Sequence, residues 1–551
     1  HLTWRRLWCV SAEPHIHCRR ERRILREIQM YANTLNLKKT ETVMKSINKY
    51  IIVAALATPL ALTSCSDSFL DVTPPDKATV DEYFSSYDHI IEAMAATYNP
   101  MRQYDWNNSQ YAPLTLCSDV MGDDVWPGGS GISDNQHLHK MFNFESSQNS
   151  SDALTGIWDQ SFKGVRNAND VLRYIDNSKQ SLTDAQYNTF SAEARTLRAF
   201  YYMQLWKFYG NIPFYMENLK APYIAEQKQA NDVYEAVISD LESAISLNAL
   251  PMKWDDDNIG RISQAAAYMI YAEMVMYQND EARYQKALSF MQQIINDTDN
   301  YDLNPDYAGI FLESGEWTKE SIFEICYKDD NAVRAWGGGV VNAGGTLYPR
   351  LIGPAGGVPE DGVDNGWGFE PVREETYNMF AEGDSRRDAT VYDARKASYT
   401  KRYQNTGLWL KKYLPYTENN KDQKADGDLN FNNNLRIYRF AETLLNAAEL
   451  LVRTNGDQTK AQEYLNRVHH RAGLTDNRAA TIDNIIDERH LEFVGEGKRY
   501  WDLVRTGKAA STLTPDAYGY RTNTWSESKK YLPIPLSEID AAHGTLKQNN
   551  Y

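Results

Sequence analysis

Apolar residues recur every three to four positions over long segments of this chain, and most of these segments come in adjacent pairs. This period is that of an amphipathic α-helix. We predict three helix pairs, namely Ala192–Tyr209 with Asp232–Leu247, Ile262–Gln278 with Arg283–Ile295, and Tyr438–Arg453 with Thr459–His470. The pattern therefore predicts a mainly α fold.

Small side chains recur in the last two pairs, including Ala272 and Ala448, and they allow paired helices to approach closely. Helix pairs of this kind are similar to tetratricopeptide repeats, although the spacing between the pairs is too irregular for a simple solenoid. The alternative interpretation is a set of unrelated amphipathic helices in an α-rich body.

Two stretches break the helical pattern. Residues 336–368 hold eleven glycines, a density that neither a helix nor a regular strand tolerates, and Tyr104–Gly131 is also irregular. Long loops inside a folded body usually carry function. We expect a single domain over residues 77–551, with a helical and loop-containing N-terminal part (about 77–330), a Gly-rich insert (about 331–430) and a helical C-terminal part (about 431–551).

A lipoprotein signal peptide is predicted at residues 44–64. Lys45 and Lys49 precede a short apolar run, which is too short to cross a bilayer of about 30 Å as a helix. The run ends in Leu-Thr-Ser-Cys, the pattern of a bacterial lipoprotein cleavage site, so Cys65 is the predicted lipid attachment site. The alternative is an ordinary secretory signal followed by a chance cysteine.

This assignment divides the N-terminal region. Residues 1–43 are interpreted as translated upstream sequence, with Met44 as the start and Met30 as a possible earlier one. Residues 65–76 form a lipidated polar tether that ends in two prolines, which stiffen it. No other segment reaches the ~18 apolar residues of a membrane span, so the lipid is the expected membrane attachment.

The charge balance excludes some partners. Beyond residue 64 the chain carries 47 basic and 70 acidic residues, a net charge of −23. Such acidity argues against binding to nucleic acid or to anionic lipid headgroups, which both need basic patches. Cys117 and Cys326 remain outside the leader and Cys65. Their spacing allows a disulfide, but two buried free thiols are the favoured interpretation.

Few motifs point to catalysis or metal binding. The G-x-S-x-G, P-loop and H-E-x-x-H patterns are all missing from the sequence. Residues 426–430 resemble the start of a calcium loop, but Phe431 stands where glycine is needed and Ile437 where the bidentate glutamate should be. We therefore predict no cofactor, and leave a structural Ca²⁺ open.

Three glutamates invite comparison with a glycoside hydrolase. Glu488, Glu492 and Glu496 step at i, i+4 and could act as paired acids. However, Arg489, Arg499 and Arg505 lie among them, and guanidinium neighbours lower the pKa that a general acid needs raised. We expect an ion-pair network, with a hydrolase that uses Glu492 or Glu496 as the less favoured alternative.

Several runs together resemble one family. They comprise the lipobox followed by Phe69-Leu70-Asp71, the segment Arg195–Tyr202, the run Arg439–Glu449, the segment Trp501–Arg505 and the ending Tyr531–Pro535 with Asn549-Asn550-Tyr551. In this order and over the whole mature chain, they resemble the SusD/RagB family of Bacteroidetes outer-membrane lipoproteins. The match is specific, but the matching motifs belong to the scaffold.

The resemblance implies a SusD-like fold, in which tetratricopeptide-like helix pairs and few short strands frame a loop-rich ligand face. It implies a non-catalytic lipoprotein on the outer membrane, facing the cell exterior, which binds oligosaccharides and delivers them to a SusC-like TonB-dependent transporter. A peptide or other nutrient binder of RagB type is the alternative. No binding residue carries over.

Candidate ligand contacts come from the two irregular stretches. Sugar rings have apolar C–H faces that stack on aromatic side chains, while their hydroxyls take hydrogen bonds from short polar groups. Exposed aromatics beside polar side chains are therefore the expected pattern. The candidates are Trp106, Asp123, Asp124, Trp126, Trp336, Tyr348, Arg350 and Trp367. For each of them, packing beneath a loop is the alternative role.

Overall fold

The computed structural model describes residues 79–106, 110–336 and 344–551. Residues Phe84–Tyr551 belong to one compact unit, and the one-turn helix α3 (Val80–Tyr83) belongs to a second unit. The predicted signal peptide, Cys65 and the tether lie outside the described residues. Within the described part of the chain, every helix is too short or too polar to cross a bilayer.

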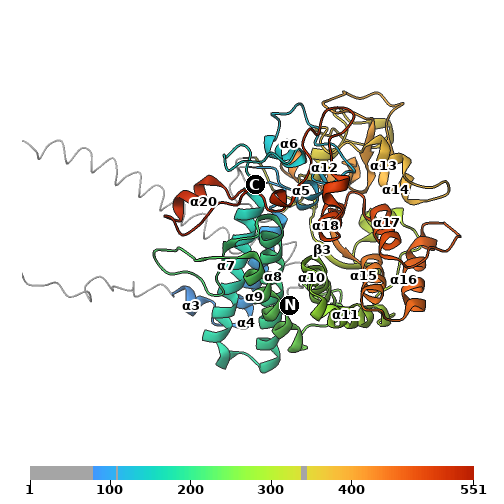
Figure 1. Cartoon of the computed structure of the whole chain (residues 1–551). Helices are drawn as coiled ribbons and strands as arrows, with labels where there is room; N and C mark the ends of the chain where they lie inside the picture. The colour runs from blue at the N-terminus through green and yellow to red at the C-terminus, as the bar shows by residue number, and fades with distance from the viewer. Residues whose placement is uncertain (1–78, 107–109, 337–343) are drawn as a thin grey trace, which may run out of the picture. The chain divides into compact units, whose positions relative to one another are not determined.

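Helices dominate the larger unit (Figure 1). Its longer helices are α4 (Tyr87–Arg102), α7 (Gly156–Asn177), α8 (Asp184–Tyr209), α9 (Ala230–Ser246), α10 (Gln264–Gln278), α11 (Tyr284–Asn296), α15 (Phe440–Arg453), α16 (Gln458–Arg471) and α17 (Ile482–Phe493). Its shorter helices are α5 (Leu114–Asp119), α6 (Gln136–Phe142), α12 (Tyr348–Ile352), α13 (Glu374–Asn378), α14 (Arg386–Thr390), α18 (Arg499–Arg505), α19 (Ala509–Thr512) and α20 (Leu536–Ala541).

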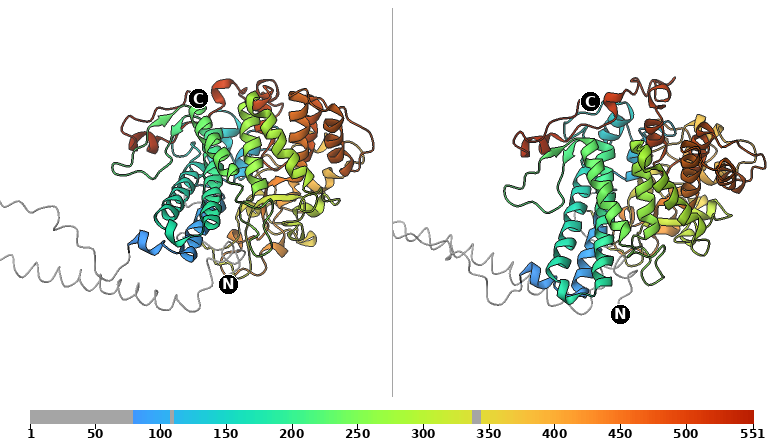
Figure 2. Two further views of the ribbon diagram at one scale, coloured as in Figure 1. Left: turned by 90° about the horizontal axis from the view of Figure 1, so that it is seen from below. Right: turned by 60° about the horizontal axis from the view of Figure 1, so that its bottom comes forward.

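The predicted helix pairs are confirmed. Helix α8 packs on α9, α10 on α11 and α15 on α16, and the pairs also contact one another through α8–α10, α9–α10 and α11–α15. The two views of Figure 2 show these helices running side by side. Helices α4 and α7, which were not among the predicted pairs, pack on each other. Since α7 also packs on α8, they extend the first pair.

Local signals explain where these helices begin. A capping box precedes α8: the Thr183 side chain accepts a hydrogen bond from the Gln186 backbone N–H, and the Gln186 side chain accepts one from the Thr183 backbone N–H. Ser263 and Asp457 cap the N-termini of α10 and α16, where their side-chain oxygens accept hydrogen bonds from backbone N–H groups of the first turn. Helices α7 and α8 approach closely at Gly164, where an added Cβ would lie 2.3 Å from the Tyr201 ring.

Strands are short and pair only in twos within the described residues. Strand β1 (Ile212–Pro213) pairs with β2 (Gln227–Lys228), β3 (Ser321–Ile325) with β6 (Leu435–Arg439), and β4 (Val391–Asp393) with β5 (Leu408–Leu410), all antiparallel. The β3–β6 ribbon is fully buried and leads directly into α15. It thereby joins the Gly-rich region to the helical scaffold.

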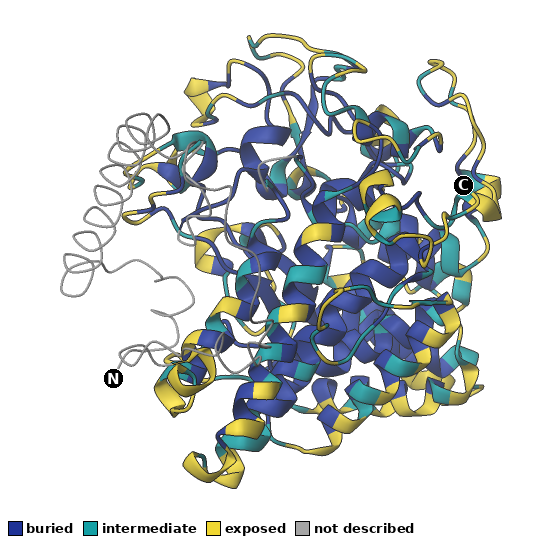
Figure 3. Ribbon diagram, turned by 90° about the vertical axis from the view of Figure 1, so that its left-hand side faces the viewer, coloured by how far each residue is buried: buried dark blue, intermediate teal, exposed yellow. Residues whose placement is uncertain are grey.

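Burial separates a packed interior from loops that cover it (Figure 3). Helix α8 is buried along most of its second half, as expected for the centre of the bundle. Cys117 and Cys326 are both buried and are not joined to each other by a disulfide, in agreement with the favoured interpretation.

Candidate ligand-binding site

Four aromatic side chains from three distant segments form a half-buried cluster, which we call the aromatic cluster: Trp106, Tyr111, Trp336 and Trp367. The Trp106 and Trp336 rings meet edge to face with centroids 4.7 Å apart, and Trp336 stacks on Trp367 at 6.1 Å with planes 20° apart. Tyr111 lies 5.8 Å from Trp367 and 6.4 Å from Trp336. The result is a partly exposed aromatic surface built from loops.

A buried ion pair brings the first two segments together. Both guanidinium nitrogens of Arg334 bond the Asp105 carboxylate, at 2.8 and 2.9 Å, and Arg334 also donates to the Trp106 carbonyl at 2.9 Å. The same carboxylate accepts the Leu347 backbone N–H at 2.6 Å. This bidentate geometry fixes direction as well as distance, so it holds Trp106 beside Trp336.

The acidic segment 426–430 holds the other side of the cluster. Asp426 accepts the Trp336 backbone N–H at 3.0 Å. Asp428 pairs with Arg350 at 2.8 Å, and the Arg350 carbonyl accepts the Trp367 N–H at 2.8 Å. The two carboxylates of the segment that resembles a calcium loop therefore hold tryptophans in place. Asp426 bonds the Trp336 backbone directly, and Asp428 acts on Trp367 through Arg350.

Acceptors for hydroxyl groups lie close to the cluster. Burial raises the pKa of Tyr111, and the nearby charges of Asp134 and Asp428 raise it further. Asp428 keeps about two-fifths of its side chain exposed despite its ion pair. The site thus combines aromatic faces with carboxylate oxygens, the pairing that a polyhydroxylated ring requires.

Four of the eight predicted contacts, namely Asp124, Trp126, Tyr348 and Arg350, have buried side chains that contact other residues of the chain. Trp126 is 2% exposed and lies beneath Arg373, whose guanidinium carbon is 3.8 Å from the ring centroid. Tyr348 donates to Glu370 at 3.0 Å. Arg350 is 4% exposed and bridges Asp364 and Asp428 at 2.8 Å each.

Asp124 and Asp123 form a separate polar group. Asp124, the fourth buried residue, contacts His490 Nε2 at 2.6 Å, and Asp123 accepts two bonds from Arg499 at 2.8 and 3.1 Å. Asp123, Asp124 and His490 are the described residues whose ligand atoms lie close enough together to hold a metal ion. Arg499 already pairs with the Asp123 carboxylate. Burial by itself would lower the pKa of His490, but the Asp124 carboxylate outweighs this effect and raises that pKa.

Trp106, Trp336 and Trp367 are therefore the predicted residues that the structure brings together, and they stay predictions as ligand contacts. Sequence reasoning missed Tyr111, although it lies inside the irregular stretch that supplied Trp106. No sequence signal ranked it above other tyrosines. The neighbouring residues 107–109 and 337–343 lie outside the described residues.

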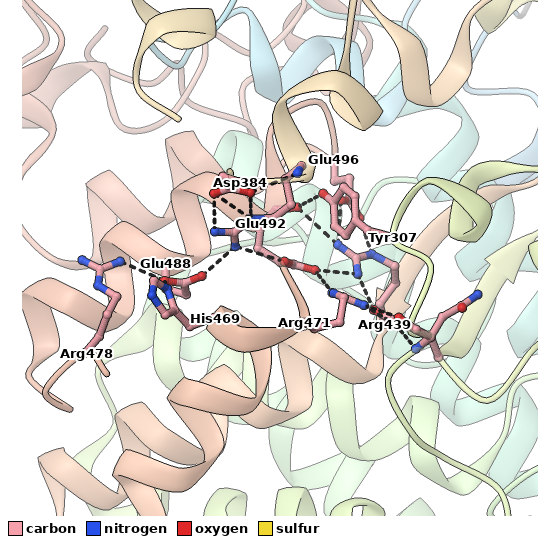
Figure 4. A network of polar contacts seen from close by, with 12 residues as sticks. Tyr307, Asp384, Arg439, His469, Arg471, Arg478, Glu488, Glu492 and Glu496 are labelled. Carbon is pink, nitrogen blue, oxygen red and sulfur yellow. Dashed lines mark hydrogen bonds and ion pairs between the residues drawn. The ribbon is translucent and has the colours of Figure 1, made fainter. Parts of the chain in front are cut away.

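The three glutamates of the possible hydrolase lie inside a buried ion-pair network (Figure 4). Glu488 contacts Arg386 at 2.6 Å and Arg478 at 2.9 Å, while Glu492 contacts Arg439 at 3.0 Å and also pairs with Arg471. The prediction of an ion-pair network is confirmed. The predicted partners are wrong, because these arginines come from other segments of the chain.

The arginines next to the glutamates in sequence turn elsewhere. Arg489 pairs with Asp502 at 2.7 Å, Arg499 with Asp123, and Arg505 with Glu449 at 2.6 Å. A helix separates its faces by 100° per residue, so sequence neighbours of Glu488 and Glu492 project away from them.

The Glu496 carboxylate of this network is ionised at neutral pH, which is unsuited to a general acid. Burial alone would raise the pKa of Glu496, but Arg439 and Lys412 outweigh it and lower this pKa to about 2. The Glu496 carboxylate accepts bonds from Arg439 Nε and from Lys412 Nζ, both at 2.7 Å. An ionised, fully paired carboxylate is unsuited to donate a proton to a leaving group, which argues against Glu496 as a general acid.

Asp119 and Glu370 form a buried pair of carboxyl groups that no cation contacts among the described residues. Apart from each other, Asp119 Oδ2 and Glu370 Oε1 have no hydrogen-bond partner in the described part of the chain. Burial raises the pKa of both groups, that of Glu370 to about 8, and the two side chains hydrogen-bond each other. Two such carboxyls are stable together only when they share one proton. The pair is connected to the loops of the aromatic cluster by Tyr348, which lies between Trp336 and Trp367 in the chain and donates a hydrogen bond to Glu370.

These features define a class of protein: a scaffold of helix pairs that presents a loop-built aromatic surface. Comparison with known proteins agrees. The family model described as "SusD family" matches residues 319–551, and the model "Starch-binding associating with outer membrane" matches residues 68–276.

Solved structures and curated relatives extend the match. Surface glycan-binding protein A from Bacteroides thetaiotaomicron, solved in complex with laminarihexaose, is 53% identical, with a TM-score of 0.81 over 84% of this chain and 99% of that one. The corresponding protein from Bacteroides uniformis is 45% identical, with a TM-score of 0.77 over 84% and 99% of the chains. SusD-like protein P25 from Formosa agariphila is 24% identical over 86% of this chain and 94% of its own length. The chain belongs to the SusD family.

Proposed function

We propose that this protein binds glycans of the laminarin class at the cell surface without cleaving them. The observation that carries the proposal is the aromatic cluster, whose half-buried rings lie beside acidic oxygens on a rigid scaffold. The 53% identical relative was solved with laminarihexaose, and a further solved structure, 28% identical, is described as a laminarin-binding SusD-like protein. Both descriptions favour laminarin as the first glycan to test.

The proposal extends to anchoring and delivery. A lipid on Cys65 holds the protein on the outer membrane, facing outward, and a SusC-like TonB-dependent transporter receives the bound glycan. The description "Starch-binding associating with outer membrane" supports this location. Mass spectrometry of the mature N-terminus tests the lipid, and co-purification from membranes tests the transporter.

Calorimetry tests the binding site. We expect laminarihexaose to bind, and Trp336→Ala or Trp367→Ala to weaken binding by about tenfold, because loss of one stacked ring removes about 1 kcal/mol or more. Trp254→Ala is the matched control, since Trp254 is a half-buried tryptophan that stacks on Arg261 instead of joining the cluster.

Three outcomes contradict parts of this proposal. Unchanged affinity in both cluster variants, with unchanged thermal unfolding, would remove the site assignment. Binding of peptides but of no glycan would favour the RagB-type alternative. Release of shorter sugars from laminarin by the purified protein would refute the non-catalytic role.

A further inference from the structure

A cavity of about 220 Å³ lies beside α6, and we call it the α6 pocket. One wall is a single face of α6 and its C-cap, because Gln136, His139, Lys140 and Asn143 are spaced at i, i+3, i+4 and i+7. The facing wall comes from two remote loops, which contribute Tyr403 with Gln404, and Tyr520. Three segments far apart in sequence therefore build this cavity.

Its apolar surface is aromatic. The rings of Tyr403 and Tyr520 lie 5.8 Å apart with planes at 61°, and the His139 ring lies 5.8 Å from Tyr403. Tyr403 and Tyr520 are half-buried, so each keeps part of its ring accessible. The space is smaller than the roughly 300–1,000 Å³ of sites for drug-sized ligands, and it suits one small ring.

The buried His139 ring bonds the Gly128 backbone but keeps one nitrogen without a partner among the described residues. The side chain is 8% exposed, and its Nε2 atom has no hydrogen-bond partner among the described residues. Burial lowers the pKa of His139 to about 4, so the ring is neutral at pH 7. A neutral imidazole nitrogen is either a donor or an acceptor, and a ligand hydroxyl, which is both, satisfies either tautomer.

The remaining polar groups favour a neutral ligand. The Lys140 ammonium pairs with the Glu145 carboxylate at 3.1 Å, so the two charges at the rim cancel. Gln404 accepts the Gly128 backbone N–H at 2.9 Å through its amide oxygen, which leaves its amide hydrogens for another acceptor. Aromatic faces, an unpartnered imidazole nitrogen and an amide donor together match a polyhydroxylated ring, and they offer no net charge to an ion.

The α6 pocket adjoins the aromatic cluster without sharing residues with it. Arg402 donates to the Trp367 carbonyl at 3.0 Å, and the next residue, Tyr403, donates its backbone N–H to Gly129 at 3.1 Å. Gly129 in turn bonds Gly368, beside Trp367, at 2.8 Å. The two sites are therefore carried by the same hydrogen-bonded loops.

We propose that the α6 pocket is a second saccharide-binding site, which holds one sugar ring between Tyr403, Tyr520 and His139. The inference rests on the proposed function for its ligand class, whereas its geometry is independent of the aromatic cluster. A glycan chain that reaches both sites gains affinity from the second contact, because that contact becomes intramolecular once the first is made.

Saturation-transfer NMR with millimolar laminarihexaose tests this site on the full chain. In the Trp336→Ala/Trp367→Ala double variant we expect residual saturation transfer. Adding Tyr403→Ala should reduce that signal at least about fivefold, and so should Ser133→Arg, which blocks the pocket from an exposed rim position. Tyr223→Ala is the matched control, because Tyr223 is 72% exposed and outside this pocket.

The outcomes separate the two proposals. Binding by the wild type with no residual signal in the double variant, or a residual signal that survives both pocket variants, overturns the second site and leaves the proposed function intact. A wild-type protein whose affinity ignores the tryptophan changes but falls with Tyr403→Ala and Ser133→Arg supports the second site and overturns the cluster. A wild type that binds no glycan overturns both. Ser133→Arg keeps the test valid if Tyr403→Ala misfolds.

Discussion

Replacing Glu370 with glutamine tests whether the buried carboxyl groups of Asp119 and Glu370 share a proton. Glu370 is fully buried, accepts a hydrogen bond from the Tyr348 hydroxyl at 3.0 Å and hydrogen-bonds Asp119, which pairs with no cation among the residues that the structure describes. The amide of Glu370→Gln reproduces the protonated acid: its oxygen accepts from Tyr348, and its NH₂ donates to Asp119. The variant therefore keeps the contacts and removes the titration of Glu370.

The magnitude follows from the pKa of Glu370, which burial raises from 4.5 to about 8. Between these values the folded protein holds a proton that the unfolded chain has released. The contribution of this proton to stability is complete below pH 4.5 and is lost as the pH rises to about 8. The full difference corresponds to at most about 5 kcal/mol, or about 1.4 kcal/mol for each pH unit.

Urea unfolding at several pH values between 5.5 and 8.5 measures the effect. We expect the free energy of unfolding of Glu370→Gln, relative to wild type, to increase by about 2–4 kcal/mol across this range, and to level off above about pH 8. Glu360→Gln is the control, because Glu360 is an exposed glutamate of the same region. A difference between Glu370→Gln and wild type that stays constant with pH would refute the shared proton.

Three further changes test the scaffold. Arg334→Met should lower the free energy of unfolding by about 3–5 kcal/mol and abolish glycan binding measured by calorimetry, because it leaves Asp105 buried and unpaired and frees the two tryptophans that the pair joins. Glu492→Gln should destabilise by a similar amount in urea unfolding, while chromatography of laminarin digests shows no sugar release before or after the change. Gly164→Ala should cost about 1–3 kcal/mol in thermal unfolding, since its Cβ would overlap the Tyr201 ring, whereas an unchanged melting temperature would contradict this close approach.

The sequence by itself determined the scaffold. Helical periodicity located α8 to α11, α15 and α16 in their contacting pairs, because an amphipathic stripe has to be buried against another element. It also indicated that Cys117 and Cys326 are buried and not joined to each other, and that the glutamates around Glu492 form ion pairs. These features depend on residue type and local spacing.

Only the tertiary structure decided which aromatic residues face outward. Trp126 and Trp367 both lie in glycine-rich loops, yet Arg373 covers Trp126 while Trp367 remains half-buried in the cluster. The bond between Asp105 and Arg334 spans 229 positions, and no periodicity records a contact of that range. Side-chain exposure in loops depends on such distant contacts, because a loop has no repeating geometry that assigns its side chains to a face.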